Sequence, residues 1–565
     1  MFIKPATIYP TMSNLPEESH AVSTSILTAC VRVLSGKANM IWTDVHMSYR
    51  GGQYSIERLL ALYDFTRNTS MLSTFLVCTI SSLPALLFII SQEMVPLQDP
   101  ANGWKENYGF WVRAVVVTAT VTYSVIVQAR YFTGGFAISR IRVLLVLIFA
   151  PCIVTAITMA IAAHIWFPIP FYIITMVPIF YVVTVASLAI SIERTAIRKM
   201  LKNSNKFSRF IAFIAAQQLM VVIYPAYQAL FQAMITTNYE YLVILLLPVM
   251  KLLVKNIALH CLTHMEDIMP ENVIFTVDFF YAFYMSTSME SSSSASTILA
   301  IILVDLAQTV TVLYRLHRRT ATILKTLEEC SATSTESSDL VSAASYLCSS
   351  IATLQHQSLN LIQVRSCIEY RLSLESLKIL CSLEKMTRNK MANHSLKILR
   401  LRRVCCRENA SIRTDLMISC NSSIDTSMTS DLPPSNCNIL QETLKVLFTS
   451  ECLLLGAFVD MIVPLFYGPF LLVMVRLPSA KYHIELENIT AENVYSSTKP
   501  IFAFALVQCA VFLLLIALVK RNLGYNPLRH LAFVMKTQQE LIQIKLLTWV
   551  LMTMTFRVVH FGAFP

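Results

Sequence analysis

The sequence predicts an all-α membrane protein, a polytopic membrane helix bundle of ten or eleven transmembrane helices. Hydrophobic residues make up 55% of the 565 positions and charged residues only 14%, and the mean hydropathy is +0.58. Soluble domains carry about 25% charged residues, so the composition excludes an ordinary soluble enzyme and a disordered chain. The apolar residues also gather into runs near the length of about 20 residues that a helix needs to cross the hydrocarbon core.

Eight of these runs predict clear membrane spans. They cover residues 74–94, 110–132, 143–165, 171–192, 210–235, 296–316, 446–475 and 500–519. Three weaker runs contain charged residues, and they cover 240–262, 272–289 and 546–563. If all eleven cross, the amino terminus lies inside and the carboxyl terminus outside.

The distribution of charge predicts a cytosolic amino terminus. Lys and Arg gather in segments that would lie inside, such as 194–209 and 315–319, whereas the predicted outer loops are neutral or acidic. The first 20 residues contain no apolar run that could serve as a signal peptide. Membrane sidedness therefore accounts for the net charge of +11, and no nucleic-acid partner is implied. The expected location is the plasma membrane or an endomembrane.

The runs divide the chain into four segments. They are a cytosolic amino-terminal segment at 1–73, a first transmembrane bundle of about eight helices at 74–316, a cytosolic insertion at 317–443, and a second transmembrane segment of two or three helices at 444–565. Within the first segment, residues 55–67 predict a short amphipathic helix on the inner membrane surface.

The insertion begins Ser/Thr-rich and becomes basic. Residues 378–413 predict contact with anionic inner-leaflet lipid, with Cys405 and Cys406 as candidate lipidation sites. The alternative is a solvated basic helix. Eight of the 14 cysteines lie in the insertion and none in a predicted outer loop, so we expect no disulfides. The sequon at Asn488 predicts glycosylation of the longest outer loop.

Charged residues inside the predicted spans are the main functional signal, because each costs about 2.5–3.5 kcal/mol on insertion scales and faces protein or water. They are Lys251, Lys255, Asp278, Asp305 and Asp460. One hypothesis is a charge-compensated site in which a proton or cation binds an Asp and loosens its contact with Lys. The alternatives are a fixed ion pair between helices, or a lysine-bearing helix at the interface.

Two further patterns accompany these charges. Residues of the fifth span form a polar stripe that either lines a solute path or bonds neighbouring helices. The stripe contains Gln217, Tyr224, Gln228 and Gln232. In the ninth span, Asp460 is followed by Pro464 and Pro469, which predicts a broken helix with exposed backbone groups beside a charge.

The sequence gives little support for an enzyme or a metal protein. His260 and His264 have the i, i+4 spacing that can hold a metal, but a lone pair near an interface is weak support. The sequence contains no Walker loop, GxGxxG, HExxH, GxSxG or CxxC motif. We therefore expect no catalytic activity, no cofactor and no metal.

The connection at 95–113 contains turn-forming residues followed by aromatic ones. Trp104, Tyr108 and Trp111 are expected at the outer interface, where amphipathic rings prefer to lie, and Arg113 is expected to extend into the headgroups. A ligand-binding outer loop is the alternative.

Several segments resemble one family. They are SIERLLALYDFTRNTS (55–70), LPALL (83–87), VPLQDPANGWKENYGFWVR (95–113), FPIPF (167–171), YNPLRHLAF (525–533) and VHFGAF (559–564). Through them the chain resembles an expanded oomycete family, of the kind found in Phytophthora, of uncharacterised multi-pass transmembrane proteins. The resemblance implies a multi-pass membrane fold and supplies no activity.

Two functional classes follow from these patterns. The first is transporter-like movement of a small solute or ion through the charged intramembrane site. The second is a membrane receptor or interaction protein whose cytosolic loop binds lipid or a partner. The number of spans exceeds the seven of common receptors, which favours transport by analogy of fold.

Overall fold

The computed structural model describes residues 52–132, 138–192, 204–234, 240–262, 265–291, 295–331, 339–354, 362–386, 436–487 and 489–561. The regular elements within these ranges are helices, and an isolated antiparallel β-bridge joins His483 to Val558. The predicted all-α fold is confirmed.

Eight helical segments in the described ranges are long and apolar enough to cross a membrane. They lie in α3 and α4 together (Met71–Ile80 and Leu83–Glu93), α5 (Tyr108–Phe132), α6 (Arg140–His164), α7 (Tyr172–Ser191), α9 (Ser204–Met234), α10 (Glu240–Leu262), α16 (Asn436–Met474) and α17 (Val494–Leu523). Seven coincide with runs that were predicted as clear spans. The eighth, α10, is the weaker run that carries Lys251 and Lys255.

The outer faces of these helices are apolar. Ile141 of α6, Val182 of α7 and Leu506 of α17 are 71%, 70% and 72% exposed. Soluble proteins rarely expose continuous apolar surface of this kind, whereas lipid tails solvate it. The chain is therefore a multi-pass integral membrane protein.

The remaining predicted spans are also helical. α13 (Ala295–Ser331) contains the whole run at 296–316 within one continuous helix. The run at 272–289 is divided into α11 (Met269–Val273), the π-helical turn η3 (Ile274–Asp278) and α12 (Phe279–Ser291), and every residue in it is buried. The run at 546–563 begins in α19 (Gln539–Thr555), which is also mostly buried, and ends at η6 (Val559–Phe561).

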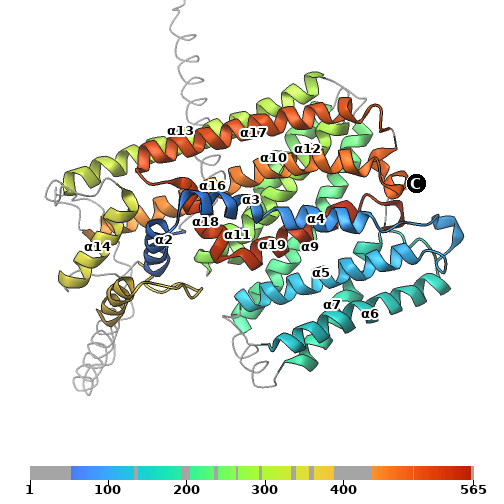
Figure 1. Cartoon of the computed structure of the whole chain (residues 1–565), viewed down its shortest axis with the longest axis horizontal. Helices are drawn as coiled ribbons and strands as arrows, with labels where there is room; N and C mark the ends of the chain where they lie inside the picture. Colours follow the sequence, from blue (N-terminus) through green and yellow to red (C-terminus); the bar gives the residue numbers. More distant parts are fainter. Residues whose placement is uncertain are drawn as a thin grey trace, which may run out of the picture. The chain divides into compact units, whose positions relative to one another are not determined.

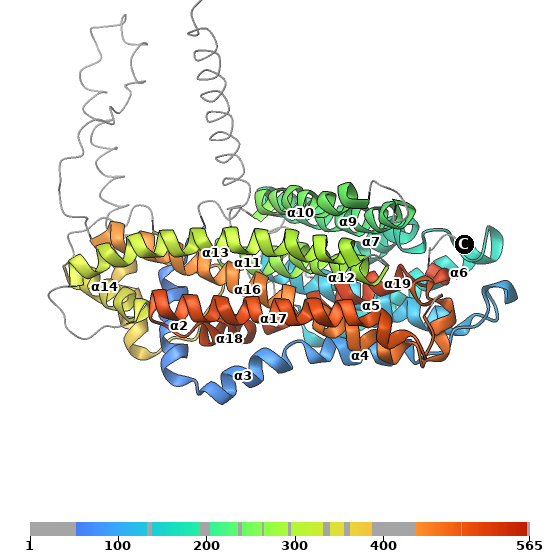
Figure 2. The same cartoon turned by 90° about the horizontal axis from the view of Figure 1, so that it is seen from above.

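The long helices run side by side along a common direction (Figures 1 and 2). α16 packs against α17, α12 and α13 and forms much of the interior. α2 (Ile56–Asn68) and α14 (Leu340–Leu354) lie at one end, which we call the α2 end. The connection at residues 94–107 and η6 lie at the opposite end, which we call the C-terminal end.

α2 departs from the surface helix predicted at 55–67. Ser55 caps its first turn by accepting a hydrogen bond from the backbone N–H of Arg58. The first seven residues of the helix are buried, including Glu57 and Arg58. The helix packs against α14 and α18 (Pro527–Thr537). Its polar side chains face the protein because they bind other helices.

The interfacial interpretation of Arg113 is wrong. Its side chain is 1% exposed and donates hydrogen bonds to the Glu93 carboxylate and, at 2.6 Å, to the carbonyl oxygen of Val95. His483 lies on the other side of this carboxylate, with 3.1 Å between Nε2 and Oε2. The guanidinium therefore joins the beginning of α5 to the end of α4 and is held inside the protein.

We expect Arg113→Ala to reduce the free energy of unfolding by about 3–5 kcal/mol, because it leaves the Glu93 carboxylate buried without its main cation. The matched control is Arg130→Ala on the same helix. Arg130 pairs with Glu540 at 3.3 Å, and both side chains are more than 40% exposed, so the cost should be about 1 kcal/mol or less. Thermal and denaturant unfolding in detergent would measure both, and equal losses would contradict the structural role of Arg113.

Candidate functional site

The structure brings the charged residues of the predicted spans together in the interior, and we call Lys251, Lys255, Asp278, Asp305 and Asp460 the charged cluster. Lys251 and Lys255 lie one turn apart on α10. The Nζ atom of Lys251 is 3.2 Å from Oδ1 of Asp278, and that of Lys255 is 3.6 Å from Oδ2. One buried carboxylate thus bridges two ammonium groups, and its negative charge reduces the repulsion between them.

A π-helical turn positions this bridging carboxylate. Asp278 is the last residue of η3, a five-residue π-helix between α11 and α12. Such turns are rare and occur often at functional sites. Gly456 of α16 faces the carboxylate, and a Cβ atom at that position would lie 3.7 Å from Oδ2. The missing side chain leaves room beside Asp278.

Asp305 joins the cluster through a tyrosine. Its buried carboxylate accepts hydrogen bonds from the Tyr281 hydroxyl at 3.1 Å and from the side-chain amide of Gln508 on α17. The ring of Tyr281 in turn lies under the Lys251 ammonium, with 4.0 Å from Nζ to the ring centroid. Asp305 is therefore surrounded by neutral donors, with Lys251 within electrostatic reach.

Asp460 has the least satisfied carboxylate of the cluster. Its Oδ1 atom is buried and has no hydrogen-bond partner among the residues that the structure describes. Pro464 lies one turn later and has no backbone N–H, so it cannot donate to the carbonyl oxygen of Asp460. The predicted break is wrong, since α16 continues through Pro464 and Pro469 to Met474. Pro464 thus leaves the carbonyl oxygen of Asp460 without its usual helical donor but does not end the helix.

The cluster contains three carboxylates and two lysines, which leaves one excess negative charge when all five are ionised. Lys251 interacts electrostatically with Asp278, Asp460 and Asp305. In a low-dielectric interior such an excess is unfavourable. A bound monovalent cation or a proton would balance it.

The polar stripe of α9 does not form one line into the cluster. Gln217 donates to Gln128 of α5 at 2.9 Å, so it joins two helices. Tyr224 is buried and stacks on Phe280 of α12, with 5.2 Å between ring centroids. Gln228 is buried and its amide has no hydrogen-bond partner within the described ranges, while Gln232 is exposed. Tyr224 of this stripe interacts electrostatically with Asp278.

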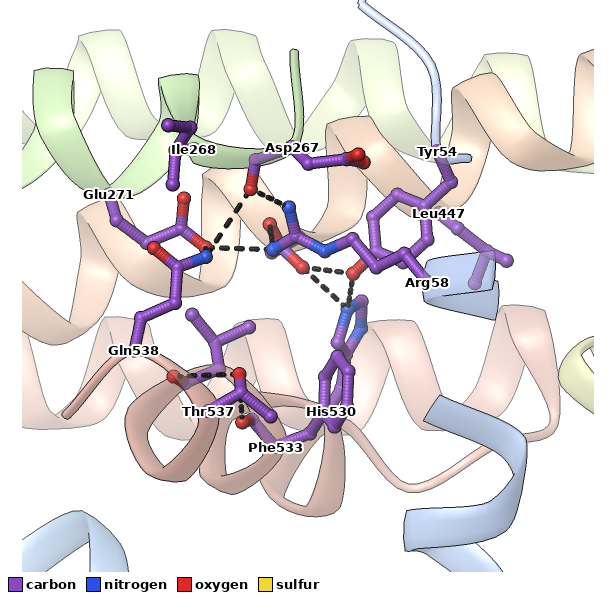
Figure 3. A network of polar contacts seen from close by, with 12 residues as sticks. Tyr54, Arg58, Asp267, Ile268, Glu271, Leu447, His530, Phe533, Thr537 and Gln538 are labelled. Atoms are coloured by element: carbon purple, nitrogen blue, oxygen red, sulfur yellow. Dashed lines mark hydrogen bonds and ion pairs between the residues drawn. The ribbon is translucent and has the colours of Figure 1, made fainter. Parts of the chain in front are cut away.

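A second polar network, at the α2 end, was missed in the sequence. It consists of Tyr54, Arg58, Glu271, Glu451, His530 and Gln538, and we call it the α2-end network (Figure 3). One guanidinium nitrogen of Arg58 lies 2.7 Å from Oε1 of Glu271 and 2.7 Å from Oε1 of Glu451. The three side chains are at most 1% exposed. Arg58 thereby joins α2 to α11 and α16.

Tyr54 and His530 lie on one side of Arg58, and Glu271 and Gln538 on the other (Figure 3). The Tyr54 hydroxyl contacts the Glu451 carboxylate and lies 2.6 Å from Nε2 of His530. His530 is also 3.1 Å from Oε2 of Glu451. Gln538, which follows α18, donates to Oε1 of Glu271 at 2.6 Å. The network therefore attaches α18 to the same two acidic residues.

The sequence did contain signals for this network. Glu451 lies inside the apolar run at 446–475, where any ionisable residue indicates a buried partner. Arg58 and His530 lie outside the predicted spans, so neither was singled out as an ionisable residue within an apolar run. Arg58 lies 393 positions from its partner Glu451, and His530 lies 79 positions from the same residue. No local sequence pattern reveals these contacts.

Several predicted sites cannot be placed. Asn488, Cys405, Cys406, His264 and residues 387–413 of the basic stretch lie outside the described residues. Among the residues that are described, no group of three or more His, Cys, Asp or Glu side chains could hold a metal ion.

Comparisons with protein-family models, with curated proteins and with solved structures found no match for this chain.

We expect Asp278→Asn to destabilise the protein by about 3–5 kcal/mol, because two ammonium groups on side chains only 15% and 14% exposed lose their shared, buried anion. Asp305→Asn is the matched comparison. The hydrogen-bond donors to Asp305 are neutral, so this change should cost about 1–3 kcal/mol. Unfolding of both purified variants in detergent measures the difference, and a larger loss for Asp305→Asn would contradict the bridging role of Asp278.

Proposed function

We propose that this protein transports a small monovalent cation or a proton through the charged cluster. The observation that carries the proposal is the environment of Asp460. Its Oδ1 atom is buried without a donor in the described structure, and Pro464 frees its carbonyl oxygen from the helix hydrogen bond. Two oxygen acceptors of one residue are thus available beside a cluster with one excess negative charge.

The chemistry of these groups favours a hard, singly charged ligand. Carboxylate and carbonyl oxygens suit protons and alkali cations, and freed backbone carbonyls in membrane helices coordinate such ions in transporters. A single excess charge is balanced by one positive charge. A divalent ion would leave the cluster positive in a low-dielectric interior, which is unfavourable.

Binding at Asp460 changes the balance of forces on Lys251. An added positive charge beside Asp460 weakens the attraction between that carboxylate and Lys251, which interacts with both Asp460 and Asp278. The contact between α10 and η3 then depends on whether the cation is present. A transport cycle needs such a difference in ligand affinity between two conformations, and the π-helical turn is the part of the interior best suited to change its hydrogen bonding.

The test is flux into liposomes that contain the purified protein. We expect uptake driven by a proton or sodium gradient in the parent, and a loss of about tenfold or more in Asp460→Asn, because neutralising Asp460 removes the excess charge that binds the cation. The control is Glu492→Gln, which changes an exposed acid in the connection before α17. Unfolding measurements would confirm that each variant is folded.

Two results would contradict the proposal. A folded parent protein without proton, sodium or potassium flux would exclude transport of these ions and favour a structural role for the cluster in a receptor or interaction protein. Flux that is unchanged in Asp460→Asn would show that the ion passes elsewhere.

A further inference from the structure

The two carboxylate oxygens of Glu271 have very different surroundings. Oε1 accepts from Arg58 at 2.7 Å and from Gln538 at 2.6 Å. Oε2 is buried and has no hydrogen-bond partner among the described residues, and the side chain is 0% exposed. An ionised carboxylate with one unsolvated oxygen is costly. A proton on Oε2 would remove that cost and leave both contacts of Oε1 in place.

Glu271 and Glu451 share the positive charge of Arg58, and Glu271 has fewer other stabilising contacts. Glu451 shares Arg58 with it, but Glu451 also receives the Tyr54 hydroxyl and lies 3.1 Å from His530. Glu451 is therefore the better stabilised anion of the two. The ionisable groups that act on Glu271 electrostatically or lie beside it are Arg58, Asp267, Glu451, Cys452, Tyr370 and Tyr131, whereas Tyr54 and His530 lie beyond Arg58.

We infer that Glu271 is a proton-binding site, separate from the charged cluster, which holds a proton on Oε2 at neutral pH and releases it in mildly alkaline solution. Burial raises the pKa of Glu271 to about 8, although Arg58 opposes this shift, and the negative charge of Glu451 adds to it. The unpaired Oε2 atom and the raised pKa both favour the neutral, protonated form of Glu271.

Release of this proton affects the elements that hold the charged cluster. Glu271 lies on α11, about two turns before Asp278 at the end of η3. A new negative charge beside Glu451 makes two buried carboxylates compete for Arg58, which weakens the attachment of α11 to α2 and α16. The expected effect of a loosened α11 on cation binding rests on the proposed function. The proton-binding site itself does not rest on it.

The test measures stability against pH in Glu271→Gln, whose amide oxygen can keep the contacts of Oε1 and whose charge is always zero. The folded pKa exceeds the ordinary value of 4.5. The stabilisation by the neutral acid is therefore complete below about pH 4.5 and is lost as the pH rises through about 8. The Tm of the parent should fall between about pH 6 and pH 9 more steeply than the Tm of Glu271→Gln.

The control is Glu442→Gln, an exposed acid on α16 that should keep the pH dependence of the parent. In infrared spectra at about pH 6, the carbonyl band of a protonated carboxyl should weaken in Glu271→Gln and persist in the control. A second variant, Gln538→Leu, removes a neutral donor to Oε1 but keeps the acid, and it should move the Tm transition to higher pH.

Equal pH slopes and an undiminished carboxyl band in Glu271→Gln would overturn the inference. If Glu271→Gln does not fold, an unshifted transition in Gln538→Leu would overturn it. None of these measurements involves flux, so a failure of the transport proposal and a failure of this one are distinguishable.

Discussion

Buried charge that must be neutralised inside the protein is the constraint on which the rest of this structure depends. Lipid tails offer no hydrogen bonds and little dielectric screening, so every ionised side chain in the interior needs a partner from another helix. Asp278 meets this requirement for two lysines at once, and the contact joins α10 to η3. Arg58 does the same for two acids, and it joins α2 to α11 and α16.

α16 packs against the continuous stretch of α11, η3 and α12, and both carry polar residues at the α2 end, at the centre and at the C-terminal end. Along α16 the order is Glu451, Asp460 and Tyr467, and along α11, η3 and α12 it is Glu271, Asp278 and Thr287. At the C-terminal end, Arg557 donates to both Tyr467 and Thr287, at 2.9 and 2.6 Å. The interior therefore contains polar contacts at both ends and at the centre, while the outer faces of the surrounding helices are apolar. This arrangement is the reverse of a soluble protein and fits a helix bundle whose outer faces contact lipid.

The membrane helices were predictable because length and hydropathy are local properties, and so was the choice of Lys251, Asp278, Asp305 and Asp460 as unusual residues. The interpretation of individual side chains was less accurate. Arg113 was expected in the headgroups and is instead buried against Glu93, since a long basic side chain near a helix end can turn either way. Pro464 and Pro469 were expected to break a helix that neighbouring helices keep continuous.

The sequence by itself determined that this chain is an all-α membrane protein and which ionisable residues lie in its apolar runs, because both depend on composition within a window of about 20 residues. Only the tertiary structure decided which charges meet. Asp278 and Lys251 are 27 positions apart and Arg58 and Glu451 are 393 apart, and their contact follows from how the helices pack. It also decided that Glu271 has one oxygen without a donor in the described structure and that Asp460 interacts electrostatically with Lys251, because the surroundings of a buried atom are set by every helix around it.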